Sequence, residues 1–168
     1  MIEPSEIKEE FEKVERENYK FRTYLKNHAD LDELDEQFLE LHNELFKVYD
    51  CSKCRNCCKE YSITFEKNEI EKASKLLKIA KKEFMDKYIE ETNNGYALKG
   101  KPCCFLTENG VCDIETCKPE GCREYTFTNK PERLFSLLNI VYFASVCPVV
   151  FEMLERLKKI YGFKRRGR

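Results

Sequence analysis

The chain has 168 residues, of which 36% are charged and 42% hydrophobic, and its formal net charge is -1. This length suits one domain, or a smaller domain with an appendage, so two complete hydrophobic cores are not expected. The near balance of 30 Lys and Arg against 31 Asp and Glu gives no global electrostatic reason to expect a nucleic acid or an anionic membrane as a partner.

The N-terminal sequence MIEPSEIKEE is acidic, and no apolar segment typical of a signal peptide follows it. No apolar run approaches the ~20 residues that a membrane span needs, so we expect a soluble cytoplasmic protein. In a reducing cytosol the ten cysteines are better explained as metal ligands or redox thiols than as structural disulfides. A secreted disulfide scaffold is the alternative, but it does not suit helices rich in Lys and Glu.

Two amphipathic helices are predicted in the first fifty residues. Apolar residues recur every three or four positions from Ser5 to about Lys26, with Asn18 as the polar member of the stripe. A second stripe starts at Leu31, and Asp30 and Glu33 beside it resemble a capping box. The short turn between the stripes predicts an antiparallel helical hairpin, with a coiled-coil dimerisation arm as the alternative. The stripes comprise Ile7, Phe11, Val14, Phe21 and Leu25, and then Leu31, Leu34, Phe38, Leu41, Leu45 and Val48.

Shorter elements are predicted in the rest of the chain. In order, they are a β-prone run at 61–65, helices at 66–79 and 81–91, strands at 95–100 and 103–114, and two apolar helices that meet at Cys147-Pro148. The second strand segment reads as a hairpin, because Glu108-Asn109-Gly110 is a favourable turn sequence. The C-terminal sequence KRRGR is expected to be a solvated end.

The sequence CSKCRNCC, which begins at Cys51, places four thiols in eight positions. Cys51, Cys54 and Cys57 have the C-x2-C-x2-C spacing that lets successive sulfurs converge on a polynuclear cluster. Bacterial ferredoxins combine this spacing with a remote Cys-Pro, and Cys147-Pro148 is such a dipeptide. A zinc site more commonly uses two separate C-x2-C pairs. Because Cys58 directly follows Cys57, we expect it to face a second site or to bridge two.

Six further cysteines follow, at Cys103, Cys104, Cys112, Cys117, Cys122 and Cys147. Neighbouring residues on a strand point to opposite faces, so only one of Cys103 and Cys104 is expected to reach a given centre. Cys104 and Cys117 fit a buried apolar role about as well as metal ligation. His28 and His42 lie far from the cysteine cluster in the sequence and are expected to be surface or packing residues.

These cysteine elements resemble those of the YkgJ-type cysteine-cluster family, the CxxCxxCC proteins, which are described as zinc- or iron-chelating. The resemblance covers about residues 51–150 and rests on CSKCRNCC followed by P-C-x-F-L, G-x-C-x-I and C-R-x-Y at matching intervals. This chain has Lys118-Pro119 and Thr126 where the family usually has Arg-Pro and Pro. Matched by position, the metal ligands implied by the resemblance are Cys51, Cys54, Cys57, Cys58, Cys103, Cys112 and Cys122, with Cys147 as an eighth.

Arg123, in the C-R-x-Y element, is predicted to bind the cofactor by offsetting thiolate charge or by donating a hydrogen bond to a ligand. An ordinary surface ion pair is the alternative. Part of the family resembles flagellin lysine N-methylases, in which the cysteine cluster accompanies S-adenosylmethionine chemistry. The chain has no G-x-G-x-x-G after a strand and no nucleophile or acid/base constellation, so the sequence leaves open whether it is an enzyme.

The sequence thus predicts an α+β, mainly α-helical fold with two domains. Residues 1–50 form the N-terminal helical hairpin, and residues 51–168 form a metal-organised core with a small β-hairpin and two C-terminal helices. A 4Fe-4S cluster is favoured over zinc, because the expected ligands are all thiolates and three arrive in one run. A second centre would use Cys58 with Cys103, Cys112 or Cys122.

The expected function is a redox, cluster-transfer or sensing role that involves a protein partner. One alternative is an S-adenosylmethionine-dependent protein-modification enzyme, similar to the flagellin lysine methylases, or a subunit of such an enzyme. Another alternative is a zinc-stabilised interaction module, in which the N-terminal hairpin holds the partner.

Overall fold

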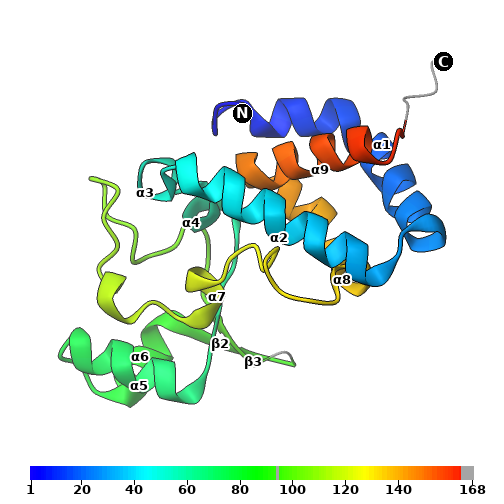
Figure 1. Ribbon diagram of the computed structural model, residues 1–168. Helices are drawn as coiled ribbons and strands as arrows, with labels where there is room; N and C mark the ends of the chain where they lie inside the picture. Colours follow the sequence, from blue (N-terminus) through cyan, green and yellow to red (C-terminus); the bar gives the residue numbers. More distant parts are fainter. Residues whose placement is uncertain (94, 164–168) are drawn as a thin grey trace. The chain divides into compact units, whose positions relative to one another are not determined.

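The structure is a computed structural model that describes residues 1–93 and 95–163. The predicted solvated tail at 164–168 lies outside the described residues. Helices dominate the described chain, and one small antiparallel sheet accompanies them (Figure 1). The predicted α+β, mainly α-helical class is therefore confirmed.

The chain divides into two compact units. The helical unit comprises Met1–Asp50 and Thr126–Arg168, and the cysteine unit comprises Cys51–Tyr125. The helical unit contains α1 (Ile7–His28), α2 (Leu31–Val48), α8 (Arg133–Ala144) and α9 (Pro148–Ile160). The first two helices follow each other across the predicted short turn, but each of them packs mainly on α8 and α9 and not on the other, so the predicted packed hairpin is not formed (Figure 1).

These contacts group the chain differently from the predicted domains 1–50 and 51–168. The two C-terminal helices pack with α1 and α2 and belong to one unit with them. The physical reason is that α1 and α2 each carry one apolar stripe, and α8 and α9 supply the apolar surface that covers both stripes. The stripes therefore have a partner within the same chain.

Aspartate side chains cap the N-termini of two of these helices. The carboxylate of Asp30 accepts hydrogen bonds from the backbone N–H groups of Asp32 and Glu33, at 3.0 and 3.1 Å, and so caps α2 as predicted. Asp35 accepts a bond from the N–H of Arg133 at 2.8 Å and so caps α8 from 98 positions away in the sequence. Both aspartates satisfy N–H groups that a helix leaves without partners in its first turn.

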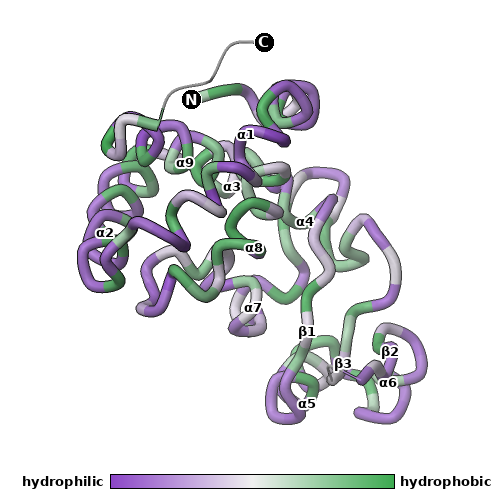
Figure 2. The backbone as a smooth tube through the Cα atoms, turned by 90° about the vertical axis from the view of Figure 1, so that its right-hand side faces the viewer, coloured by the Kyte–Doolittle hydropathy of each residue, from purple (hydrophilic) through white to green (hydrophobic). Residues whose placement is uncertain are grey.

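The core of the helical unit contains most of the predicted stripe residues. Asn18 is 1% exposed, so the polar member of the first stripe is buried as expected, whereas Val48 at the end of α2 is 75% exposed. Helix α8 is largely hydrophobic along its length (Figure 2), which suits a helix that contacts α1, α2 and α9. Among the described residues, no helix combines the length and apolar character needed to cross a membrane. Buried stripe residues include Phe21, Leu25, Leu34 and Phe38.

The cysteine unit consists of short elements. They are α3 (Cys51–Cys54), α4 (Asn56–Glu60), β1 (Thr64–Phe65), α5 (Lys67–Leu76), α6 (Lys81–Tyr88), β2 (Ile89–Thr92), β3 (Gly95–Leu98), a 3-10 turn (Glu115–Cys117) and α7 (Glu120–Arg123). The strands form one antiparallel sheet in the order β1-β3-β2, in which Thr64 pairs with Ala97 and Ile89 pairs with Leu98. The central strand β3 thus pairs with β1, which follows the cysteine run, and with β2, which follows α6.

Two local predictions are wrong in this unit. The helix predicted at 81–91 ends at Tyr88, because Ile89–Thr92 pairs with β3 and forms the β-hairpin instead. The hairpin predicted at 103–114 has a single bridge, between Leu106 and Cys112, and its described residues form no strand. That segment is a tight loop, which the backbone bond from the Thr107 N–H to the Val111 carbonyl closes at 2.8 Å.

An apolar cluster from several elements forms the core of the cysteine unit. The Phe84 ring stacks on Phe105 and lies edge-on to Phe65, with centroid distances of 5.9 Å in both pairs. Cys112 is part of this core, and Cys103 and Cys122 pack against it. The thiols therefore lie at the edge of apolar side chains, where a charged thiolate is poorly solvated.

Candidate metal centre

Two short helical turns present the cysteines of CSKCRNCC. Cys51 and Cys54 lie one turn apart on α3, and Cys57 and Cys58 lie on α4. Between the two turns, Arg55 has φ 51°, a left-handed conformation that is uncommon for a side chain with a Cβ. This residue reverses the chain, and its N–H donates to the Cys51 carbonyl at 3.1 Å. The sequence motif is therefore a compact local structure.

Backbone hydrogen bonds connect this motif to the downstream cysteines. The N–H of Cys103 donates to the carbonyl of Cys58 at 2.7 Å, which fastens the two segments together. The carbonyl of Cys103 in turn accepts a bond from the N–H of Leu106 at 3.1 Å, and Leu106 forms the bridge to Cys112. Cys122 is on the short helix α7. Cysteines from four stretches of sequence are thus positioned within one unit.

Four of the predicted ligands act on one another electrostatically: Cys58, Cys103, Cys112 and Cys122, which we call the four-thiol group. Burial raises the pKa of Cys122 to about 12, and the charges of the other three thiols raise it further. Burial also raises the pKa of Cys103 to about 11 and raises the pKa of Cys112, with the charge of Cys58 contributing to both. The four side chains are therefore near enough to affect one another electrostatically, and a second centre that uses Cys58 with Cys103, Cys112 or Cys122 stays a prediction.

Cys58 differs from the other three members of the group. A hydrogen bond with the Cys57 thiol, together with the positive charges of Arg55 and Lys118, lowers the pKa of Cys58 to about 6, against the opposing effect of burial. At neutral pH this side chain is therefore mostly a thiolate. A metal ion would meet one ionised sulfur and three protonated ones.

Arg55 and Lys118 are functional candidates that the sequence prediction missed. Both form ion pairs with Glu115, with Arg55 Nη2 at 3.3 Å from Glu115 Oε2. The signal available for Arg55 was a cation inside the CSKCRNCC motif, and the signal for Lys118 was a basic residue at the position where the family usually has Arg before Pro. These two cations lie where they offset negative charge on the thiols.

The contacts of Arg123 are to groups other than thiols. Its Nη1 donates to the Lys118 carbonyl, and its Nη2 lies 3.9 Å from Glu69 Oε1. The Arg123 side chain is 55% exposed. A cofactor-binding role for Arg123 stays a prediction.

The remaining cysteines have different surroundings. Cys147 is buried in the helical unit, where it precedes α9 and its carbonyl accepts a bond from the Phe151 N–H at 3.0 Å. Cys51 and Cys104 are exposed, and Cys117 is partly buried in the 3-10 turn. Ligation by Cys51, Cys54, Cys57 and Cys147 stays a prediction from their spacing.

The kinds of ligand atom in the cysteine unit indicate which metals the four-thiol group can bind. Among residues 1–93 and 95–163, no three His, Cys, Asp or Glu side chains are gathered closely enough to hold a metal ion as they stand. Binding therefore requires the thiols to lose protons and shift, as is common where metal binding and folding are linked. Residues 51–125 contain nine cysteines and no histidine. An all-sulfur donor set of this kind suits zinc or an iron–sulfur cluster.

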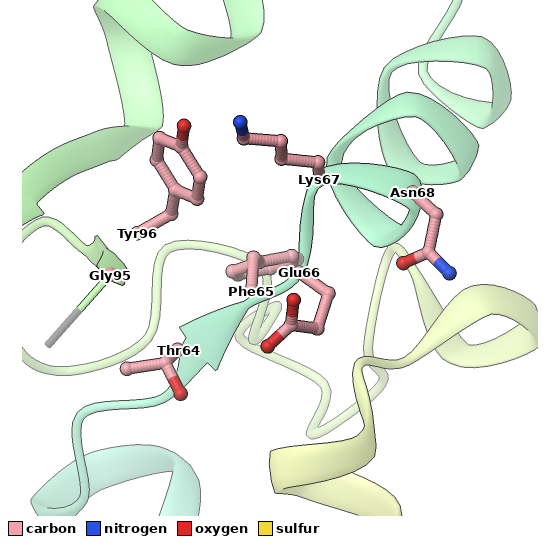
Figure 3. A pocket seen from close by; sticks show the side chains of 7 residues that line it. All are labelled: Thr64, Phe65, Glu66, Lys67, Asn68, Gly95 and Tyr96. Carbon is pink, nitrogen blue, oxygen red and sulfur yellow. The ribbon is translucent and has the colours of Figure 1, made fainter.

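A separate cleft lies on the sheet side of the cysteine unit. It has a volume of about 410 Å³ and is lined by strand β1, the first residues of β3 and the start of α5. The Lys67 ammonium and the Tyr96 hydroxyl point toward each other, while the Glu66 carboxylate points another way (Figure 3). No cysteine lines this cleft, so it is not part of the thiol site.

One comparison with known proteins gave a match. The sequence model of the family CxxCxxCC, whose description reads "Putative zinc- or iron-chelating domain", matches residues 50–148. Searches of curated proteins and of solved structures found no match. The matched span is more than half of the chain and contains all ten cysteines.

Proposed function

The chain belongs to the CxxCxxCC family of zinc- or iron-chelating domains, and from that premise we propose that its cysteine unit holds an iron–sulfur cluster. Family membership supports a bound metal, and the iron–sulfur identity is our proposal. The observation that carries it is the four-thiol group, in which cysteines that are far apart in the sequence act on one another. A 4Fe-4S cluster takes four thiolate ligands.

Cys58, Cys103, Cys112 and Cys122 would hold this cluster. The packing of Cys103, Cys112 and Cys122 with the apolar core limits the access of water to the site. The spacing of Cys51, Cys54 and Cys57 supports a second set of ligands. A bound cluster would supply reversible one-electron chemistry, which suits redox, cluster-transfer or sensing roles with a protein partner.

The residues around the thiols prepare the site for a negatively charged centre. A four-thiolate metal site leaves about two negative charges, and uncompensated charge at a partly buried site is costly. Arg55 and Lys118 are near enough to lower the pKa of Cys58, and Glu115 orients both cations through ion pairs. Cys58, already ionised, is the expected first contact for incoming metal.

Reversible reduction tests this proposal. Full-length protein is purified without oxygen, and its visible spectrum is recorded before and after dithionite and after reoxidation. We expect a coloured protein whose absorbance falls on reduction and returns on oxidation. A metal that gives no spectral change would contradict the proposal and would favour a zinc-stabilised interaction module instead.

Matched serine variants locate the centre. Cys112→Ser should abolish or strongly reduce the colour, because it removes a member of the four-thiol group. Cys104→Ser is the control, since Cys104 is an exposed thiol outside that group. Equal colour in the two variants would show that the cluster is not held by these ligands. Measured S-adenosylmethionine binding and methyl transfer would favour the enzymatic alternative.

A further inference from the structure

A buried carboxylate joins two helices next to the thiol site. Glu69 lies on α5 and is 7% exposed. Its Oε1 accepts a hydrogen bond from the Glu120 N–H at 2.7 Å, and its Oε2 accepts one from the Glu66 N–H at 2.8 Å. Glu69 therefore satisfies a donor at the start of α5 and another at the start of α7.

Helix α7 depends on this contact because it has little stability of its own. It spans four residues, Glu120–Arg123, and no side chain of its N-cap residue Pro119 bonds to it. One helical turn is unstable in isolation, since nucleation costs more than a single backbone hydrogen bond returns. The Glu69 carboxylate takes the place of the missing N-cap side chain, and its negative charge interacts favourably with the positive N-terminal end of the helix.

Both ends of α7 are near the same carboxylate. Glu120 donates to Glu69 Oε1 at the start of the helix, and Arg123 Nη2 lies 3.9 Å from that oxygen at its end. Cys122 lies between these two residues. Gly121, on the same turn, lies close to β1, since an added Cβ would be 3.6 Å from the Thr64 carbonyl oxygen.

We propose that Glu69 is a positioning residue for the metal centre, which fastens α7 so that the Cys122 thiol faces the other three thiols. This inference rests on the proposed function, since it concerns the same ligands. Groups that orient metal ligands typically contribute 10–100-fold to metal affinity. Loss of the carboxylate leaves the Glu120 N–H without this acceptor and releases the segment that carries Cys122.

Glu69 also belongs to the capping box of α5, so a matched control must separate the two roles. Glu66 is the other member of that box, and its side chain accepts from the backbone of Glu69. Glu66→Ala damages the α5 cap while leaving the Glu69–Glu120 bond in place. Glu69→Ala damages the same cap and also removes the bond to α7.

The test uses metal-free full-length protein and Co²⁺ alone as the probe. Cobalt affinity is measured by competition with a coloured chelator, and thiolate-to-cobalt charge-transfer absorbance reports how many sulfurs bind. We expect Glu69→Ala to bind Co²⁺ about 10–100-fold more weakly than the wild type, with lower charge-transfer absorbance. Glu66→Ala should match the wild type in both readouts, even if its melting temperature falls as far.

Glu69→Gln keeps one amide oxygen for the Glu120 N–H and covers the case in which Glu69→Ala does not fold. Its Co²⁺ affinity should be lower than that of the wild type and of Glu66→Ala, and higher than that of Glu69→Ala. Where Glu69→Ala cannot be measured, the affinity of Glu69→Gln should still be lower than that of the wild type and of Glu66→Ala. Wild-type affinity in both Glu69 variants, or the same loss in Glu66→Ala, overturns the positioning role alone. A wild-type protein that binds no Co²⁺ through its thiols overturns the proposed function together with this inference.

Discussion

The helical unit and the cysteine unit are specified by different kinds of interaction. In the helical unit, the apolar stripes of α1 and α2 meet apolar helices, and side chains such as Phe21 and Phe38 are fully buried. The cysteine unit has shorter helices, loops between β3 and α7, and nine of the ten cysteines. The comparison teaches that hydrophobic burial is sufficient to define the first unit, whereas we propose that the second also depends on metal ligation.

Metal removal should produce the largest difference between the two units, in the rate of amide exchange. After complete chelation we expect amide exchange to accelerate across residues 99–125, because this loop-rich segment carries three members of the four-thiol group and loses its cross-links. Exchange in α1 and α2 should not change. The measurement is hydrogen exchange followed by mass spectrometry, and equal protection of 99–125 with and without metal would contradict this account.

The affinity for metal should rise steeply with pH. Burial raises the pKa of Cys103 to about 11 and of Cys122 to about 12, and also raises the pKa of Cys112, so these thiols hold their protons at pH 7. Cys58, with a pKa lowered to about 6, has already lost its proton. Binding to all four thiols should therefore release about three protons, and affinity should rise about 1,000-fold between pH 7 and pH 8.

Calorimetry of Zn²⁺ binding in buffers with different ionisation enthalpies counts these protons. The sign follows from the raised pKa values: protons compete with the metal below those values, so higher pH favours binding. Release of one proton or none would show that the buried thiols do not ligate. Repeating the titration with Cys112→Ser should reduce the count by one.

A core substitution in the helical unit should affect stability without affecting the metal. Phe38 is fully buried on α2, and Phe→Ala changes in protein cores cost about 3–5 kcal/mol. We expect Phe38→Ala to lower the free energy of unfolding of the helical unit by this amount. Urea denaturation followed by circular dichroism checks the stability, and metal per chain in the folded variant should equal that of the wild type.

The smallest effect is expected at the cap of α2. Asp30→Ala removes the acceptor for the N–H groups of Asp32 and Glu33, a change that typically costs about 1 kcal/mol. Asp30→Asn keeps a side-chain oxygen and should restore most of the loss. Thermal unfolding of the three proteins measures the difference, and identical melting temperatures would show that the cap contributes nothing.

Local patterns in the sequence predicted the features that depend on neighbouring residues. The spacing of apolar residues indicated α1 and α2, and Asp30 was recognised as a cap because its bonds go to residues two and three positions away. Strand β2 was missed because Ile89–Thr92 follows α6 without a break, and its pairing with Gly95–Leu98 decides its conformation. The grouping of α8 and α9 with α1 and α2 likewise depends on long-range packing.

The candidate site shows the same limit. Residue type and spacing identified the cysteines, and which of them share a metal centre stays a prediction. The polar residues around the thiols were not predicted, because Glu69 reaches Glu120 across 51 positions and Arg55 reaches Glu115 across 60. Contacts between single polar residues at such separations leave no periodic signal in one sequence.

The iron, zinc and acid-labile sulfide content of full-length protein purified without oxygen tests the central claim most directly. The account predicts iron and sulfide in equal amounts, with about four of each per occupied cluster. Stoichiometric zinc without iron or sulfide would contradict the iron–sulfur proposal. Protein that is folded but contains no metal would contradict the whole view of the cysteine unit as a metal centre.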